Sequence, residues 1–250
     1  MFVRESGPAR APAVLLLHGQ ALDGSMYDAL AARLAARFRV LVPDLPGYGR
    51  TPLLAPYSLA RARAAIEEML AGRDVRSAAI VGFSLGGYHA LAMALAGQVA
   101  VTRLALLAAP AGADAPFREA FAGYARAVRG GMKVGPAFAQ LAIPPAYAAA
   151  HPELAPRIIA AADAVPAETY IAEFEALSAL PDLRPRLGEI RVPTLVRVGD
   201  ADQNVPLAMV KPVADAIPGA TLEIVPGCGH LYLVQDAEAT AASLERFLGG

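Results

Sequence analysis

A serine flanked by glycines is the first feature of the sequence that indicates chemistry. Segment 82–86 reads Gly-Phe-Ser-Leu-Gly, and it stands between the apolar run 78–81 and an apolar helical pattern. A sharp strand-to-helix turn presents the Ser84 hydroxyl as a nucleophile, and small neighbours let adjacent backbone pass. The backbone amide of Leu85, at the helix start, is a predicted oxyanion donor. The alternative is a glycine-rich turn whose serine only caps the helix.

A serine hydroxyl needs a positioned base near neutral pH, and the sequence offers four histidines. His230 follows the last strand pattern and precedes the final helix, so a loop can place it over the sheet edge. We therefore predict that it is the base. His18 ends a strand beside Gly19, which favours a buried ring bonded to backbone. For His89 and His151 we expect packing or solvent contact.

The base in turn needs a carboxylate that holds its second ring nitrogen. Segment 199–206 follows the strand pattern 194–198 and lies between the serine and the histidine in chain order. Asp202 is deeper in this loop and is the predicted acid, whereas Asp200 is expected to bond loop amides as a turn residue. Asp114, just past another strand end, is the outside alternative.

A second oxyanion donor is expected from the loop that follows the strand pattern 14–17. The backbone amide of Gln20 is the predicted donor, because Gly19 lets this backbone approach closely. The Gln20 side chain points into the pocket or lies on its rim, and the sequence does not decide between them. Cys228 stands two residues before His230, and a small buried filler is its favoured interpretation.

Strand and helix patterns alternate along most of the chain, which predicts an α/β fold with a mostly parallel sheet flanked by helices. The expected strands are 14–17, 40–42, 78–81, 101–107, 194–198 and 221–225. The expected helices are 26–37, 59–71, 85–96, 207–216 and 236–248.

The alternation stops at residues 111–181, where proline and glycine interrupt helical segments and no strand pattern occurs. We expect a helical cap there, over the carboxyl edge of a core made of 1–110 and 182–250. Packing is the favoured role of its aromatic residues, and lining a substrate pocket is the alternative. Two apolar stripes at helical spacing need burial in this insertion. They are Phe117, Phe121, Tyr124 and Val128, and Tyr170, Phe174 and Leu177.

Composition limits the classes of function. The 250 residues are 56% hydrophobic and 18% charged, with a formal net charge of −1 and no basic run, so nucleic acid is not an expected partner. Every apolar run is far shorter than the roughly 20 residues of a membrane span, which predicts no membrane partner. Residues 1–13 lack the apolar segment of a secretory signal, and we therefore expect a cytoplasmic protein. One cysteine and four scattered histidines give no zinc spacing, so we expect no metal.

The sequence contains five motifs that together resemble the α/β-hydrolase superfamily. They are His18-Gly19, segment 44–49, the serine turn 82–86, the aspartate loop 202–206 and Gly229-His230. The resemblance implies about eight strands, a variable helical cap after the sixth strand, the acid at Asp202 and an oxyanion donor at Gln20. Residues 1–13 are too short for the family's opening hairpin, so that sheet edge is expected to be reduced. Asp44 and the glycines after it resemble a structural turn of the family.

A serine at position 84 weighs against haloalkane dehalogenase or epoxide hydrolase chemistry, because relatives of those kinds use aspartate there. The sequence is similar to carboxylesterases, enol-lactonases, carbon–carbon bond hydrolases and cofactor-free perhydrolases. We predict a carboxylesterase-like serine hydrolase (EC 3.1.1) that cleaves a small, largely apolar ester, lactone or related acyl substrate through an acyl-enzyme. No organic cofactor is required for that reaction. Whether the chain forms a homo-oligomer does not follow from these residues.

Two alternatives remain open at this point. A carbon–carbon bond hydrolase or lyase would use the same triad, and a basic side chain facing Ser84 from the cap would favour it. The candidates for that side chain are Arg118, Arg126, Arg129 and Lys133. The second alternative is a ligand-binding or signalling member of the fold that lost turnover.

Overall fold

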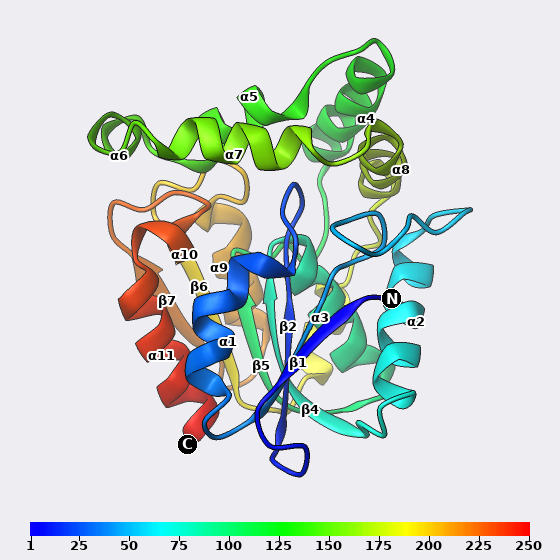
Figure 1. Ribbon diagram of the computed structural model, residues 1–250, viewed down its shortest axis with the longest axis vertical. Helices are drawn as coiled ribbons and strands as arrows, with labels where there is room; N and C mark the ends of the chain where they lie inside the picture. The colour runs from blue at the N-terminus through cyan, green and yellow to red at the C-terminus, as the bar shows by residue number, and fades with distance from the viewer.

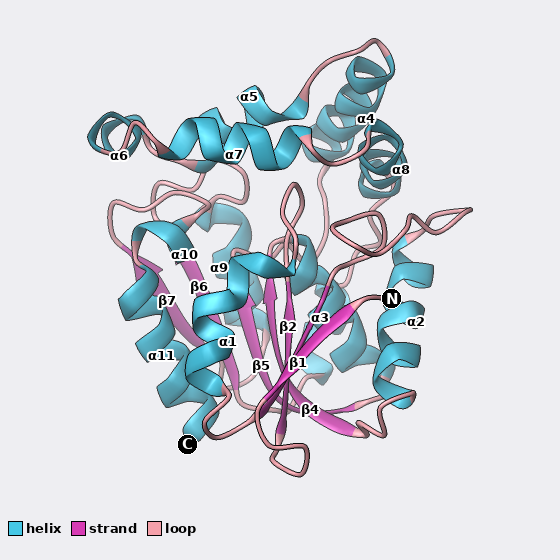
Figure 2. Cartoon of the chain, in the orientation of Figure 1, coloured by secondary structure: helices cyan, strands magenta, loops and turns pink.

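A seven-stranded sheet forms the centre of the computed structural model, which describes residues 1–250 (Figures 1 and 2). The strands are β1 Val3–Ser6, β2 Ala13–Leu17, β3 Arg39–Pro43, β4 Ser77–Phe83, β5 Ala100–Leu107, β6 Thr194–Gly199 and β7 Thr221–Val225. Their order in the sheet is β1-β3-β2-β4-β5-β6-β7. The β1 strand is antiparallel to β3, and every other neighbouring pair is parallel. The predicted α/β class with a mostly parallel sheet is confirmed.

The inner strands are mostly apolar, as is typical of strands covered on both faces. Residues 14–17 of β2 are each 0% exposed, and so are Ile80 and Val81 of β4. All six residues of β6 are buried as well. Because these strands are parallel, the loops at their carboxyl ends gather along one edge of the sheet.

Helices cover both faces of this sheet, as the alternation of patterns predicts. On one face α1 packs beside α11, where Arg33 forms ion pairs with Glu238 and Glu245. On the other face lie α2, α3 and α9 (Figure 1). None of the helices combines the length and the apolar composition that crossing a membrane requires. The bounds are α1 Asp28–Leu34, α2 Leu59–Ala71, α3 Leu85–Ala96, α9 Leu207–Ala216, α10 Tyr232–Gln235 and α11 Ala237–Gly249.

The amino-terminal edge of the sheet is reduced, as expected, but the number of strands differs from the one that the resemblance implied. The resemblance implied about eight strands, whereas the structure has seven, because the amino-terminal segment contributes the single strand β1 in place of a hairpin. This strand was not predicted, since Val-Arg-Glu-Ser has no apolar run. With one strand fewer before it, the helical insertion follows the fifth strand, β5, and not the sixth.

Five helices connect β5 to β6 and lie across the carboxyl edge of the sheet, at the top of Figures 1 and 2. Their bounds are α4 Ala115–Arg129, α5 Val134–Ala142, α6 Pro145–Ala150, α7 Leu154–Asp163 and α8 Ala167–Ser178. The two predicted apolar stripes face each other between α4 and α8. The Phe174 ring centroid lies 5.5 Å from that of Phe121 and 5.7 Å from that of Tyr124. The stripes therefore belong to a second hydrophobic cluster, which also includes Leu85 and Tyr88 of α3.

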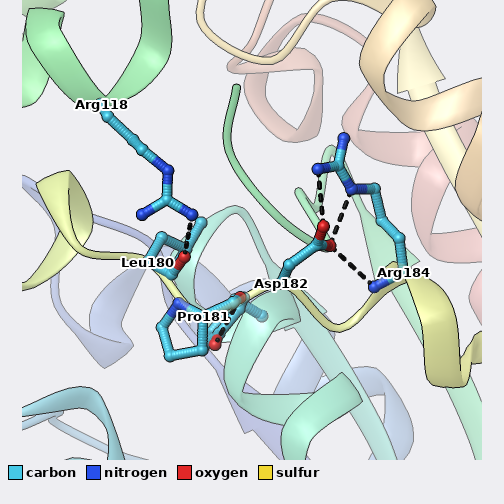
Figure 3. A network of polar contacts seen from close by, with 6 residues as sticks. Arg118, Leu180, Pro181, Asp182 and Arg184 are labelled. Carbon is cyan, nitrogen blue, oxygen red and sulfur yellow. Dashed lines mark hydrogen bonds and ion pairs between the residues drawn. The ribbon is translucent and has the colours of Figure 1, made fainter. Parts of the chain in front are cut away.

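The crossing from α8 back to β6 is tied to the rest of the molecule by polar contacts (Figure 3). Arg118 of α4 donates to the Leu180 carbonyl oxygen at 2.8 Å, and the Tyr88 hydroxyl of α3 donates to that of Pro181 at 3.1 Å. Within the crossing, Asp182 forms an ion pair with Arg184 at 2.7 Å. The Leu183 amide donates to the Ala111 carbonyl oxygen at 2.8 Å, which joins the two crossings directly. The helical insertion therefore leaves and re-enters the sheet region at adjacent points.

Candidate active site

Ser84 occupies a strained turn between β4 and α3. Its φ of 52° and ψ of −116° are in a region that costs a non-glycine residue about 1–3 kcal/mol. Glycines make the turn possible by letting strands and helix approach. A Cβ added to Gly82 would lie 2.4 Å from the Gly86 carbonyl oxygen, and one added to Gly86 would lie 2.2 Å from that of Leu17. The structure thus has the strand-turn-helix context that the sequence predicts for Ser84.

Asp202 and His230 form a short buried hydrogen bond. The His230 Nδ1 lies 2.7 Å from the Asp202 Oδ2, and the residues are 3% and 4% exposed. The other oxygen, Asp202 Oδ1, accepts from the amides of Asn204 and Val205, each at 2.9 Å. An Nδ1–H that donates to this carboxylate leaves Nε2 free to accept a proton. Asp202 therefore fixes both the orientation and the tautomer of the ring.

The loop that carries His230 is held by further local bonds. The Gly227 amide donates to Asp200 Oδ1 at 2.7 Å, and the Gly229 amide donates to Gln235 Oε1 at 2.9 Å. Asp200 thus bonds a loop amide, as expected, but that amide belongs to the loop after β7 and not to its own turn. The first bond joins the loop after β7 to the loop after β6, 27 positions earlier, whereas the second spans only six positions.

A buried arginine supports the same region from within β6. Arg197 is 7% exposed and forms ion pairs with Glu223 and with Asp236, the latter at 2.6 Å. Its carbonyl oxygen accepts from the Tyr232 hydroxyl at 3.1 Å. Because Asp236 and Tyr232 bound the short helix α10 just after His230, this cluster anchors the far end of the base loop. The sequence argument missed it, although a charged residue inside an apolar strand was a usable signal.

The loop after β2 lies on the other side of Ser84 and is held by His18. The His18 Nδ1 contacts the Gly19 carbonyl oxygen at 2.8 Å, and Nε2 accepts from the Leu45 amide at 2.8 Å. Burial lowers the pKa of His18, so the ring is neutral and structural, as expected. No carbonyl or side chain accepts from the Gln20 amide, and the next residue, Ala21, has a left-handed φ of 61°.

The predicted site residues gather around one small cavity. Ser84, Leu85, Gln20 and His230 all line a space of about 70 Å³. Asp202 does not line it, since its carboxyl lies behind the imidazole with 0% of the side chain exposed. A second cavity of about 210 Å³ shares five lining residues with the first. They are Gln20, Phe117, Phe121, Phe138 and Asn204.

Comparison with known proteins agrees with this arrangement. Residues 14–243 match the alpha/beta hydrolase family. The chain belongs to that family. It is 34% identical over 254 residues to a pimeloyl-[acyl-carrier protein] methyl ester esterase of Xanthomonas campestris pv. campestris (strain B100), with 95% of each chain covered.

Two solved structures are also similar to this alpha/beta hydrolase. A hydrolase from Pseudomonas aeruginosa PA01 has a TM-score of 0.92 at 28% identity, covering 99% of this chain and 94% of that one. The enol-lactonase from Burkholderia xenovorans LB400 has a TM-score of 0.92 at 25% identity, covering 100% and 96%. The predicted α/β-hydrolase fold and the predicted class, a hydrolase of carboxylic esters, are confirmed.

The other histidines, Asp114 and Cys228, which the sequence also offered as possible site residues, have surroundings that indicate other roles in this hydrolase. Burial lowers the pKa of His89 to about 4, and its ring nitrogens have no partner. His151 is 44% exposed at the end of α6. Asp114 caps α4 by accepting from the Phe117 amide at 2.9 Å, so it is not a partner of the base. Cys228 is buried and unpaired. No three His, Cys, Asp or Glu side chains are arranged to hold a metal ion.

One buried carboxyl beside the site was missed by the sequence argument. Glu173 of α8 is 1% exposed, and its Oε2 accepts from the Gln20 side-chain amide at 2.6 Å and from the Tyr48 hydroxyl. Burial raises the pKa of Glu173 to about 7, against the opposing effect of these two hydrogen bonds. The usable signal was its position on the same helical face as Tyr170 and Phe174, where a charge is out of place. The bond ties the Gln20 side chain to the helical insertion.

Proposed function

We propose that this hydrolase cleaves a small, largely apolar carboxylic ester or lactone through an acyl-enzyme on Ser84. In this proposal His230 is the general base and Asp202 orients it. The backbone amides of Gln20 and Leu85 are the oxyanion donors. The observation that carries the proposal is the 2.7 Å contact between Asp202 and His230, next to a cavity lined by both His230 and Ser84.

The reaction would proceed in two balanced halves. His230 Nε2 removes the hydroxyl proton as Ser84 Oγ attacks the carbonyl carbon, and the negative charge moves to the carbonyl oxygen. Collapse of this intermediate breaks the ester bond, and the leaving alkoxide takes the proton from His230. Water then attacks the acyl group with the same base, releasing the acid and restoring Ser84. Each oxyanion donor is worth about 3–4 kcal/mol in cases where removal has been measured.

The Gln20 and Leu85 amides fit the donor role for two separate reasons. As the first residue of α3, Leu85 has no intrahelical acceptor for its amide. The Gln20 amide has no acceptor in the surrounding protein. An amide that is already bonded to a carbonyl could not stabilise a developing charge without breaking that bond, so two free amides on one cavity support the assignment.

The walls of the cavities support an apolar substrate. Twelve of the fifteen residues that line the larger cavity are hydrophobic, and neither cavity is lined by an arginine or a lysine. The carbon–carbon bond alternative called for a basic side chain facing Ser84, and three of its four candidates are engaged elsewhere. Arg118 donates to backbone carbonyls, while Arg126 and Arg129 pair with Glu119 and Glu175. This distribution favours the ester over the carbon–carbon bond alternative.

The relatives fit the same chemistry. The names of two of them, a methyl ester esterase and an enol-lactonase, describe attack on an ester or on its cyclic form. We also propose the division into a core, residues 1–110 and 182–250, and a cap, residues 111–181. The bond between Leu183 and Ala111 supports boundaries close to these positions, because it joins the two crossings.

The test is Ser84→Ala, assayed on p-nitrophenyl esters, lactones and methyl esters of increasing chain length. We expect turnover to fall by on the order of 10⁵-fold or more, because loss of a triad nucleophile leaves only binding and oxyanion stabilisation. Ser77→Ala is the matched control, since Ser77 is exposed at the opposite end of the same strand. A folded Ser84→Ala protein that turns over as fast as the parent would refute the mechanism. A native parent that fails to react with a fluorophosphonate would favour the non-catalytic alternative.

A further inference from the structure

Glu173 joins the helical insertion to two loops of the sheet region through a single oxygen atom. Its Oε2 accepts from Gln20, 153 positions away in sequence, and from Tyr48, 125 positions away. The other oxygen, Oε1, is buried and has no partner. A carboxyl that contributed only to packing would gain by hydrogen bonding through both oxygens or by replacement with an apolar group. This arrangement instead aims both donors at one oxygen.

The loop that Glu173 contacts is under backbone strain. Ala21 has a left-handed φ of 61°, a conformation that surrounding contacts must maintain in a residue with a Cβ. The contact is made by the side chain of Gln20, the residue immediately before Ala21. The backbone amide of Gln20 faces no protein acceptor. Fixing this side chain therefore fixes the peptide units on both sides of Gln20.

The surroundings of Glu173 contain donors but no opposite charge. The titratable groups facing it are Tyr48 and Tyr57 from the loops and Tyr170 from α8. Burial raises the pKa of all three phenols, so they stay protonated and neutral. No lysine, arginine or histidine pairs with the carboxyl. Hydrogen bonds to an ionised acceptor are roughly twice as strong as neutral ones, so the charged form of Glu173 holds its two donors most firmly.

From these contacts we propose that Glu173 is a positioning residue for the oxyanion loop, and that its carboxylate form supports faster turnover than its protonated form. The inference rests on the proposed function, because it acts through the amide of Gln20. When a proton from solvent adds to the carboxyl, both hydrogen bonds lose their charge assistance and the strained backbone at Ala21 is held less tightly. The backbone amide of Gln20 is then less well positioned to donate to the developing oxyanion.

The test is Glu173→Gln, which keeps an acceptor oxygen toward Gln20 and Tyr48 but removes the charge. Both kcat and KM are measured on one p-nitrophenyl ester between about pH 5.5 and about pH 8.5, on either side of the raised pKa of about 7. We expect the ratio of parent to variant kcat to rise from about one at the acid end to about ten at the alkaline end. KM should change less than kcat. Any pH dependence that parent and variant share cancels in this ratio.

Glu175→Gln is the matched control, because Glu175 lies on the same helix but is 52% exposed and paired with Arg129. Its ratio should stay near one at every pH. A ratio for Glu173→Gln that does not change with pH, or an effect confined to KM, would overturn the inference. Ser84→Ala in the same assay separates the two proposals. If that variant is inactive while the Glu173→Gln ratio is flat, only the role of Glu173 fails.

A second variant covers the case in which Glu173→Gln does not fold. Tyr48→Phe removes one donor that lowers the pKa of Glu173, so that pKa should rise further. The pH at which kcat rises as Glu173 ionises should then be higher in Tyr48→Phe than in the parent, with little difference between the two kcat values at the acid end. No shift in a folded Tyr48→Phe protein would count against the inference.

Discussion

The two sides of Ser84 are supported in different ways. On the base side, the side-chain polar contacts of Asp202, His230 and Arg197 join residues of β6, β7 and the loops and helix that follow them. On the oxyanion side, the Gln20 side chain depends on Glu173, which belongs to the helical insertion. One side is thus built within the sheet region, whereas the other is completed by a segment that enters from outside it.

The insertion contacts both sides of Ser84, and the two sides differ only in whether its side chains or its backbone make the polar contact. The insertion also reaches the base side, where the Leu231 amide donates to the Ala142 carbonyl oxygen at 3.1 Å. That bond is between neutral backbone groups and does not change with pH. On the oxyanion side, Thr169 adds a bond to the Gly47 carbonyl oxygen at 3.1 Å, next to the ionisable Glu173. With the role proposed for Glu173, the insertion would influence turnover rate through one titratable group.

The largest effect should come from the base side. Asp202→Asn removes the charge and favours the wrong tautomer of His230, so we expect kcat to fall by about 10⁴-fold. Asp200→Asn is the control, since Asp200 bonds only a loop amide, and its loss of activity should stay within about tenfold. Steady-state kinetics on one ester measures both. Equal losses in the two variants would break the distinction between the two aspartates.

A smaller effect is expected on the oxyanion side from Gly19→Ala. The added Cβ would lie 2.8 Å from the Phe83 ring and 3.1 Å from the Ser84 Cβ, so the loop must shift away from the nucleophile. Displacing one oxyanion donor should lower kcat by about 10²-fold. Gly188→Ala, which has no atom within 4 Å of the added Cβ, should be unchanged. A kcat for Gly19→Ala equal to that of the parent would remove Gln20 from the list of donors.

The smallest effect concerns stability and follows from the raised pKa of Glu173, about 7 against 4.5. The folded state binds this proton more tightly than the unfolded state, so the contribution is present below about pH 4.5 and is lost as pH rises through about 7. The free energy of unfolding of the parent, relative to Glu173→Gln, should fall by up to about 3 kcal/mol over that interval. Urea denaturation at the two ends of the interval measures it. A difference that grows in the opposite direction would show that ionised Glu173 stabilises the fold.

The sequence predicts the base side well because its signals are local. Ser84 and His230 stand in short motifs at strand ends, and a parallel sheet brings such ends together whatever the detailed packing. Helices 59–71, 85–96 and 207–216 have the predicted bounds for a similar reason, since each is a regular pattern bounded by its own punctuation.

The oxyanion support could not be predicted in the same way. The bond between Gln20 and Glu173 spans 153 positions, and its formation depends on where five helices settle above the sheet. Nothing in the local pattern of either residue specifies the other. The strand Val3–Ser6 was missed for a different reason, because an edge strand with polar residues lacks the apolar run that identifies inner strands.

The adjacent crossings near Ala111 and Leu183 have a consequence for how such an enzyme can diversify. A segment whose two ends meet can be exchanged for another of different length without disturbing the order of strands. In this chain, however, such a transplant would also carry away Glu173. A chimaera would inherit the hydrogen-bonded pair of Asp202 and His230 but a Gln20 side chain without its acceptor, unless the donor sequence supplies a carboxyl at the same place.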